Sequence, residues 1–399
     1  MPRTLGIITI GQAPRDDIAV LFAQHAPAGT KVVLRGALDG LSTVGPVGDP
    51  DYAGLHGDIA LSLTGANAAL PLDSFFAVNP AMPVFARLFK AGQAAVVHAA
   101  ATGYRDRSHF DGQDVLESGL PGPGNATTGW LNRALENLPK GDRVAKLGGL
   151  AIGPSTPLVI RGAAPVLGWA PQALPAPGDT LAERVLDLYN HRDPVLAAAL
   201  QKGLDADRMA MSDQLGGNTM KPKGGLDNAA GMRQAAQGAA RLMAADDGPR
   251  IAALAFDGWD THVNEGGATG RLANLLGGLD GAFEEFQNGL GARWRDTAIV
   301  AITEFGRTAR INGTVGTDHG TGTVVLLAGG AIKGGRVIAD WPGLKPAQLY
   351  QQRDLAPTSD VRAVLKGLLA DQFGLSSAVL GGKVFPDSAT VNPMRDLVV

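Results

Sequence analysis

The sequence predicts an α/β fold, in which a mostly parallel sheet is sandwiched by helices. Apolar segments of strand length recur along the chain, and glycine or a polar turn follows each of them. They are almost continuously apolar rather than alternating, which is typical of strands buried on both faces of a parallel sheet. Helical patterns lie between several of them, and this alternation indicates an α/β sandwich.

The expected strands can be placed in chain order. They are residues 5–10, 31–34, 94–100, 147–152, 250–256, 297–303 and 323–327. Helices are expected at residues 16–25, which follow a proline and begin with acidic residues, and at 272–290 and 360–373, where apolar residues recur every three or four positions.

The middle of the chain has a different character. Residues 154–180 are rich in proline and are expected to be irregular or to form short antiparallel structure. Residues 181–247 are rich in alanine, have a helical pattern and are broken by glycine pairs. We interpret residues 181–247 as a helical insertion.

Composition excludes several classes of function. The 35 basic and 38 acidic residues give a formal net charge of −3, which argues against nucleic acid as a partner. The chain has no cysteine, so thiolate nucleophiles and cysteine-ligated metals are excluded. No apolar run reaches the roughly 18 residues of a membrane span, and the first residues lack the pattern of a signal peptide.

Reactive side chains follow the expected strands, at the places where an open α/β sheet binds its ligands. Each of these segments contributes a carboxylate, an imidazole, a hydroxyl or a guanidinium. They are Asp39, then Arg107, Ser108 and His109, then Asp260 and His262, then Glu304 and Arg307, and finally His319 just before the last strand. This convergence indicates a functional site more strongly than any single residue does.

Taken alone, each position has a functional and a structural interpretation. Asp260 and His262, two residues apart, would face one side of an extended segment and ligate a divalent metal, or would lie in a solvated loop. His319 in a glycine-flanked turn could contact a ligand. Alternatively, the neighbouring Asp318 could cap a helix or strand. Glu304 and Arg307 could be a metal ligand and an anion clamp, or a buried ion pair. Ser108 could be a nucleophile or a helix N-cap.

Long stretches of the chain closely resemble the bacterial domain of unknown function 1501 family, from about residue 32 onward. The matching stretches are LRGALDGLSTVGPVGDPDY (34–52), DRSHFDGQD (106–114), GWLNRAL (129–135), FDGWDTHVNEGGATGRL (256–272), TEFGRTARINGTVGTDHGTG (303–322), GGAIKGGRVIADWPGL (329–344) and QRDLAPTSDVRAVL (352–365). That family is similar to sulfatases and alkaline phosphatases in its expected fold, and its members usually carry a twin-arginine export signal.

The resemblance implies a metal site at the carboxyl edge of the sheet. In the alkaline phosphatase superfamily two metals clamp the attacking and leaving oxygens of a transferred phosphoryl or sulfuryl group. The positions that correspond to metal ligands are Asp39, Asp260, His262, Glu304 and His319, and Ser108 stands where the nucleophile is expected.

The sequence departs from the superfamily pattern at two places. Residue 305 is Phe where a histidine usually follows the acidic ligand, and His109 is a candidate replacement. The signature of a formylglycine nucleophile is missing around Ser108, which disfavours that chemistry.

The N-terminus resembles a second family. LGIITIGQAPRDD (5–17) and RGALDGLS (35–42) look like the start of the AroM-type family, so residues 1–30 are interpreted as an AroM-like β–α segment and residues 31–399 as the sulfatase-like domain. Family resemblance implies a periplasmic location. The alternative is a cytoplasmic protein, because the AroM-like segment stands where the export signal is expected.

The leading hypothesis is therefore a metal-dependent hydrolase of small anionic phosphate or sulfate esters, with Arg107 and Arg307 holding the anionic group. The ligands leave Zn, Mn, Ca and Mg open. The rival hypothesis is a non-catalytic binding or surface-associated protein on a degenerate hydrolase fold. Racemase-like chemistry, suggested by the AroM-like start, is disfavoured because racemases of that type use a pair of thiols and the chain has none.

Overall fold

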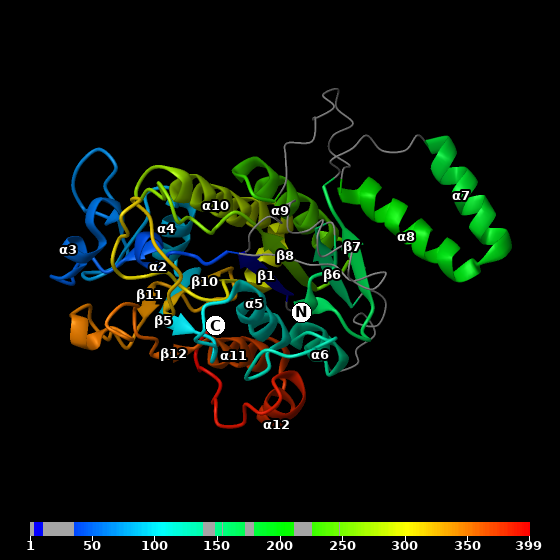
Figure 1. The fold of residues 1–399 in the computed structure, drawn as a ribbon. Coiled ribbons are helices and arrows are strands. Elements are labelled where there is room, and N and C mark those ends of the chain that lie inside the picture. The colour runs from blue at the N-terminus through cyan, green and yellow to red at the C-terminus, as the bar shows by residue number, and fades with distance from the viewer. Residues whose placement is uncertain are drawn as a thin grey trace.

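The computed structural model describes residues 4–10, 36–138, 148–153, 155–171, 179–210, 226–246 and 248–399. It shows a mixed α/β fold, as the sequence predicted (Figure 1). The main sheet has the order β11-β5-β10-β9-β1-β8-β6-β7, and β12 also pairs with β5. Its strands are β1 (Thr4–Ile10), β5 (Ala94–Ala101), β6 (Gly149–Ile152), β7 (Val166–Trp169), β8 (Ile251–Phe256), β9 (Thr297–Ile302), β10 (Thr323–Ala328), β11 (Arg336–Ile338) and β12 (Ser359–Asp360).

One strand of the main sheet runs against its neighbours. Parallel pairing joins β7, β6, β8, β1 and β9, whereas β10 is antiparallel to both β9 and β5. Because two reversals cancel, β5 points in the same direction as β9. The carboxyl ends of β5, β8 and β9 and the beginning of β10 therefore lie at the same edge of the sheet.

A second, small sheet is antiparallel throughout. It has the order β2-β4-β3, formed by β2 (Val44–Gly45), β3 (Leu70–Pro71) and β4 (Ala77–Val78). Short helical segments accompany it, namely α2 (Gly40–Thr43), α3 (Tyr52–His56) and the 3₁₀ turn η1 (Gly57–Ile59).

Helices cover both faces of the main sheet (Figure 1). One face carries α4 (Pro83–Lys90), α9 (Ala229–Ala244) and α10 (Arg271–Leu290), and the other carries α5 (His109–Ser118), α6 (Trp130–Glu136), α11 (Val361–Phe373) and α12 (Ser377–Val379). Shorter turns are η2 (Leu158–Ile160), η4 (Gly291–Asp296), η5 (Pro346–Gln348) and the π-turn η6 (Leu380–Val384). No helix in the described ranges is long and apolar enough to cross a bilayer.

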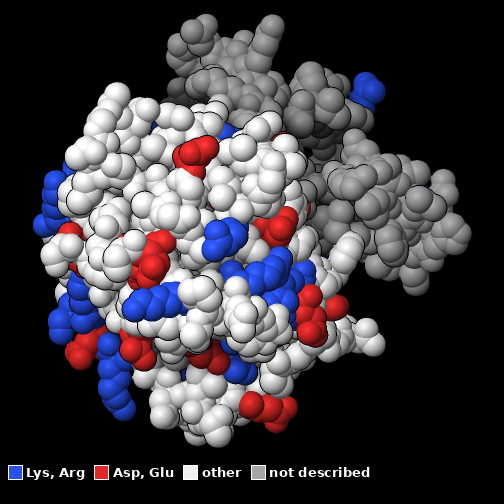
Figure 2. All heavy atoms as spheres, turned by 60° about the vertical axis from the view of Figure 1, so that its left-hand side comes forward, with Lys and Arg blue, Asp and Glu red and all other residues white. Residues whose placement is uncertain are grey.

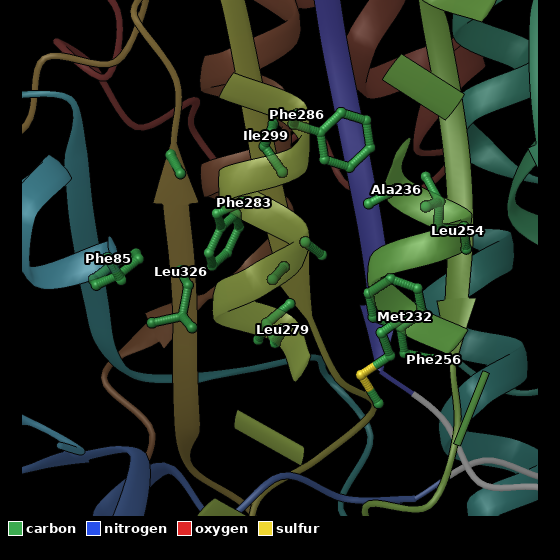
Figure 3. Packing of buried hydrophobic residues seen from close by; sticks show 14 of the residues in the cluster. Phe85, Met232, Ala236, Leu254, Phe256, Leu279, Phe283, Phe286, Ile299 and Leu326 are labelled. Atoms are coloured by element: carbon green, nitrogen blue, oxygen red, sulfur yellow. The ribbon is translucent and has the colours of Figure 1, made fainter. Parts of the chain in front are cut away.

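A hydrophobic core lies on each face of the main sheet, and neighbouring residues of one strand pack into the two cores alternately. Ile299 and Ala301 of β9 pack beneath α9 and α10, while Ala298 and Val300 pack on the side of α11. This alternation follows from the two-residue period of a strand, and it explains why the strand sequences are continuously apolar. In the first core, the rings of Phe283 and Phe85 lie 5.8 Å apart between α10 and α4 (Figure 3).

Most of the expected elements are present, and two lie outside the described residues. The predicted strands at 5–10, 94–100, 147–152, 250–256, 297–303 and 323–327 correspond to β1, β5, β6, β8, β9 and β10, and the helices at 272–290 and 360–373 to α10 and α11. The predicted strand at 31–34 and helix at 16–25 fall outside the described residues, as does the proposed boundary near residue 30.

One part of the middle of the chain, residues 154–180, differs from its interpretation. Residues 154–180 were expected to be irregular or antiparallel, but β7 pairs in parallel with β6, because it extends the parallel half of the sheet at its edge. The region 181–247 contains most of α7 (Asp179–Arg192), α8 (Pro194–Ala210) and α9. Small residues such as Ala236 and Ala239 let α9 lie close to α10 and the sheet, so α9 is part of the first core.

Phe283 offers a test of this packing. Phe283→Ala removes a fully buried ring from between two helices and the sheet, and we expect it to lower the free energy of unfolding by about 3–5 kcal/mol. Val195→Ala is the control, because Val195 on α8 is 79% exposed and its change should stay within about 0.5 kcal/mol. Urea unfolding of both variants measures the difference, and equal effects would contradict the assigned core.

Candidate metal centre

Four segments distant in the sequence meet at the edge of the sheet where β5, β8 and β9 end and β10 begins. His109 opens α5 after β5, Asp260 and His262 follow β8, Glu304 follows β9, and His319 precedes β10. A parallel β10 would have placed His319 at the opposite edge. The antiparallel strand is therefore the reason that this histidine joins the others.

Three imidazoles and one carboxylate lie close together around His319 and Asp260. The Nε2 atom of His319 lies 2.9 Å from Nε2 of His109 and 3.0 Å from Nε2 of His262. One carboxylate oxygen of Asp260 lies 2.9 Å from Nε2 of His262 and 3.2 Å from Nε2 of His319. The other carboxylate oxygen lies 3.6 Å from Nε2 of His109. We call His109, Asp260, His262 and His319 the histidine cluster.

The outer nitrogen of each imidazole faces an oxygen acceptor. Nδ1 of His319 donates to the carbonyl of Arg107 at 3.1 Å, and Nδ1 of His109 donates to Glu304 at 3.0 Å. Nδ1 of His262 lies 3.5 Å from a carboxylate oxygen of Asp318. Since a carbonyl or carboxylate oxygen accepts a hydrogen bond, these contacts favour the tautomer with the proton on Nδ1 and direct the Nε2 lone pairs toward one another.

Facing lone pairs repel one another unless a positive charge lies between them. Protons can supply part of that charge. Burial lowers the pKa of His109, but the hydrogen bonds that Asp260 and Glu304 accept from its ring outweigh burial and raise the pKa to about 9. A divalent cation would supply all of it. Imidazoles whose outer N–H is held by a carboxylate or a carbonyl are the usual ligands of protein metal sites. The donor set therefore fits a metal, and the N and O atoms of His109, Asp260 and His319 lie close enough to share one ion.

Arg307 holds Asp260 in place. Its Nη1 donates to Asp260 at 2.5 Å, while Nε and Nη2 donate to the hydroxyl and the carbonyl of Thr317 at 3.0 and 2.6 Å. Burial would raise the pKa of Asp260, but the three imidazoles and Arg307 hold it far below its usual range. The sequence suggested that Arg307 clamps an anion. Its side chain is instead fully buried and paired with Asp260, whereas the alternative interpretation was an ion pair with Glu304.

Two glycines allow the loop around His319 to approach the other segments. A Cβ atom at Gly316 would overlap the carbonyl of His262, and one at Gly320 would overlap the carbonyl of Arg307. The glycine-flanked turn that the sequence showed thus permits close backbone packing next to two residues of the site.

Phe305 occupies the position at which the sequence resemblance led us to expect a histidine. Its ring centroid lies 5.0 Å from that of His109 and 5.3 Å from that of His319. The aromatic ring therefore supports two imidazoles from the side, and His109 reaches the cluster from a different segment.

The carboxylate of Asp39 forms no hydrogen bond with the histidine cluster within the described part of the chain. One of its oxygens caps α2 through the amide of Leu41 at 2.9 Å, and the other lies 3.0 Å from Nε2 of His56. The outer nitrogen of His56 donates to the carbonyl of Ala309 at 2.9 Å. Burial opposes both charges, but their attraction lowers the pKa of Asp39 and raises that of His56. The predicted metal ligand Asp39 is thus the partner of a buried histidine.

Ser108 and Arg107 flank the cluster without donating to it through their side chains. Ser108 stands at the N-cap position of α5, yet its hydroxyl makes no capping hydrogen bond. The guanidinium of Arg107 pairs with Asp354 at 2.8 Å and donates to Gln351 at 2.6 Å, so only its carbonyl reaches His319. Arg107 therefore orients His319 through its carbonyl, and its guanidinium does not contact the histidine cluster.

The sequence analysis missed three participants. His56 had no motif around it, and it meets Asp39 only because α3 folds back. Asp354 lies far along the chain from Arg107. Glu265 is buried and accepts from the hydroxyls of Thr261 and Thr317 at 2.8 and 2.6 Å, and burial raises its pKa to about 7. Glu265 lies inside the stretch 256–272, but its spacing gave no separate signal.

The comparison with protein families identifies the chain. Residues 31–385 match the model described as "Protein of unknown function (DUF1501)". The chain belongs to the DUF1501 family. This match covers the whole histidine cluster, so the cluster lies in the DUF1501 part of the molecule. Residues 5–45 also match the AroM protein family, as the N-terminal resemblance predicted.

Comparisons with individual proteins are less informative. No curated protein matches this DUF1501 chain. The solved structure titled "Crystal structure of Ps i-CgsB in complex with k-i-k-neocarrahexaose" is similar with a TM-score of 0.45 and 11% identity, over 98% of this chain and 77% of that one. Because this similarity is remote, the ligand named in that title is not assigned to this chain.

Metal content tests the cluster. His319→Ala removes the imidazole that lies nearest to both other histidines, and we expect bound metal to fall from about one equivalent to near zero. His191→Ala, on α7, is the control and should keep the metal. Inductively coupled plasma mass spectrometry on protein purified without chelator measures both, and retention of metal by His319→Ala would contradict the assignment.

Replacement of Arg307 should weaken metal binding without abolishing it. Arg307→Gln leaves the four ligands but frees Asp260 to move, so we expect metal affinity to fall about 10–100-fold. Competition with a chromophoric chelator measures the affinity. Arg161→Gln is a matched control, because Arg161 is an exposed residue that bonds the carbonyl of Thr156. An Arg307 variant with unchanged affinity would show that the ion pair does not position Asp260.

Proposed function

We propose that this protein is a metal-dependent hydrolase of phosphate or sulfate esters and that the histidine cluster holds its divalent metal. The observation that carries the proposal is the convergence of three Nε2 atoms on Asp260. The alkaline phosphatase-like fold and the sulfatase-like relationship remain part of the proposal, and they rest on the sequence resemblance.

The donor set narrows the choice of metal. Imidazole nitrogen suits Zn better than Ca or Mg, which prefer ligand sets made of oxygen alone. His109, His319 and Asp260, which lie close enough to share one ion, would give Zn three protein ligands and leave its fourth tetrahedral position open for substrate or water. We therefore propose Zn first, with Mn as the next candidate.

Each residue of the site would then have a distinct task. A divalent metal, when bound, would stabilise the negative charge that develops on the ester oxygens. Glu304 and the carbonyl of Arg107 would keep the protons of His109 and His319 on Nδ1, and Arg307 would hold Asp260. Ser108 is proposed as the nucleophile, because it is joined in the chain to His109 and Arg107, both of which contact the cluster.

The cluster is open enough for a substrate to reach it. The side chain of Asp260 is 12% exposed, that of His319 is 25% exposed and that of His262 is 38% exposed. A structural ion pair has no need of such access. By contrast, the side chains of Asp39 and His56 are at most 1% exposed, so we assign that pair a structural role.

A matched ester panel tests the activity. The Zn-loaded protein should hydrolyse para-nitrophenyl phosphate, bis-para-nitrophenyl phosphate or para-nitrophenyl sulfate, and chelation should abolish turnover. Asp260→Ala should lower kcat/KM at least about 100-fold, because it removes a ligand. Asp205→Ala on α8 is the control, since Asp205 is a 54% exposed surface carboxylate.

Two further outcomes separate the alternatives. A Ser108→Ala variant that keeps full turnover would assign the attack to water instead of Ser108. Stoichiometric metal with no turnover on any ester would overturn the hydrolase proposal and favour a binding protein on the same fold. An exported location rests on family resemblance alone, and cell fractionation would test it.

A further inference from the structure

A cavity of about 230 Å³ adjoins the histidine cluster. Its apolar wall includes Leu55 and Ile311, and its polar wall includes Arg310, Asn312 and Arg353. Pockets for whole small molecules are usually about 300–1,000 Å³. This cavity is therefore suited to one substituent of a ligand rather than to an entire large ligand.

Asn312 and Asp318 form the boundary between the cavity and the cluster. Both line the cavity. The amide of Asn312 donates to the carbonyl of His262 at 3.0 Å and to Asp318 at 3.3 Å, and Asp318 in turn faces Nδ1 of His262 at 3.5 Å. The cavity therefore lies beside His262, which is the most exposed side chain of the cluster.

The cavity wall has an excess of positive charge. Two arginines, Arg310 and Arg353, and one carboxylate, Asp318, line the cavity. Arg353 lies 3.3 Å from the buried Asp354, a carboxylate outside the lining that is also paired with Arg107 at 2.8 Å. Arg310 is exposed at the wall, and it takes part in no ion pair among the residues that the structure describes. The negative charge of Asp318 is directed toward His262 and Asn312. Figure 2 shows basic side chains gathered near the middle of one face, with acidic side chains around them.

We propose that this cavity binds a second anionic group of the substrate, so that the substrate class is esters that carry a further phosphate, sulfate or carboxylate. The inference rests on the proposed function, because it assumes that the reacting group lies at the histidine cluster. Arg310 and Arg353 are the residues that select the substrate. Guanidinium groups suit this task because their planar donors match the oxygens of all three anions.

Non-hydrolysable ligands test the proposal without any requirement for turnover. The probes are α,ω-bisphosphonates with one to six methylene groups, each compared with the monophosphonate of the same chain length. Isothermal titration calorimetry on the Zn-loaded full-length protein measures both affinities. At one or two spacer lengths the bisphosphonate should bind at least about ten-fold more tightly than its monophosphonate, which is the size expected for charge-assisted hydrogen bonds.

Two variants test whether the cavity causes the tighter binding of the bisphosphonate. Arg310→Gln and Arg353→Gln should each reduce the ratio of the two affinities, leaving metal content and monophosphonate affinity unchanged. Arg208→Gln is the matched control, because Arg208 lies on α8, is 71% exposed and pairs with Asp205. Its ratio should equal that of the unmodified protein.

The outcomes distinguish this inference from the function on which it rests. Metal and monophosphonate binding with no advantage at any spacer length would overturn the second anion site alone. An advantage that persists in both cavity variants would also overturn it. A protein that takes up no metal would overturn the hydrolase proposal and this inference together.

Discussion

The ion pair between Asp260 and Arg307 is the interaction on which the arrangement of the site depends. Arg307 follows β9, Asp260 follows β8, and Thr317 on the loop before β10 binds the remaining donors of the guanidinium. A buried arginine without these partners would be strongly destabilising, so the three loops are fixed together. His262 and His319 sit two residues beyond Asp260 and Thr317 respectively, and this is why a structural ion pair also determines where the imidazoles lie.

Two groups of charged side chains lie in this part of the molecule, one fully buried and one partly exposed. In the buried one, Asp39 and His56 neutralise each other, and no solvent reaches them. In the other, three imidazoles share one carboxylate at a partly exposed position. In the second group Nε2 atoms face one another, whereas Nε2 of His56 faces a carboxylate. This difference separates a candidate metal centre from a paired core.

Phe305 stands at a position where the sequence resemblance led us to expect a histidine. Phe305 cannot ligate a metal, but its ring supports His109 and His319 from the side. His109 supplies an imidazole from the beginning of α5, and Glu304 binds its outer nitrogen. Glu304, expected to be a ligand, therefore contacts the cluster through His109. The cluster thus has the donors for one ion, and two arginines, Arg310 and Arg353, line the neighbouring cavity.

The sequence by itself determined the α/β class, most strand positions and the segments that carry reactive side chains, because continuous apolar runs and the residues that follow them are local features. It also indicated His109 as a replacement ligand. Tertiary structure alone decided which of these side chains meet. The reversal of β10 brings His319 to the shared edge, the return of α3 pairs His56 with Asp39, and Asp354 draws the guanidinium of Arg107 away. Strand direction and long-range charge pairing depend on contacts between distant segments, and spacing along the chain does not record them.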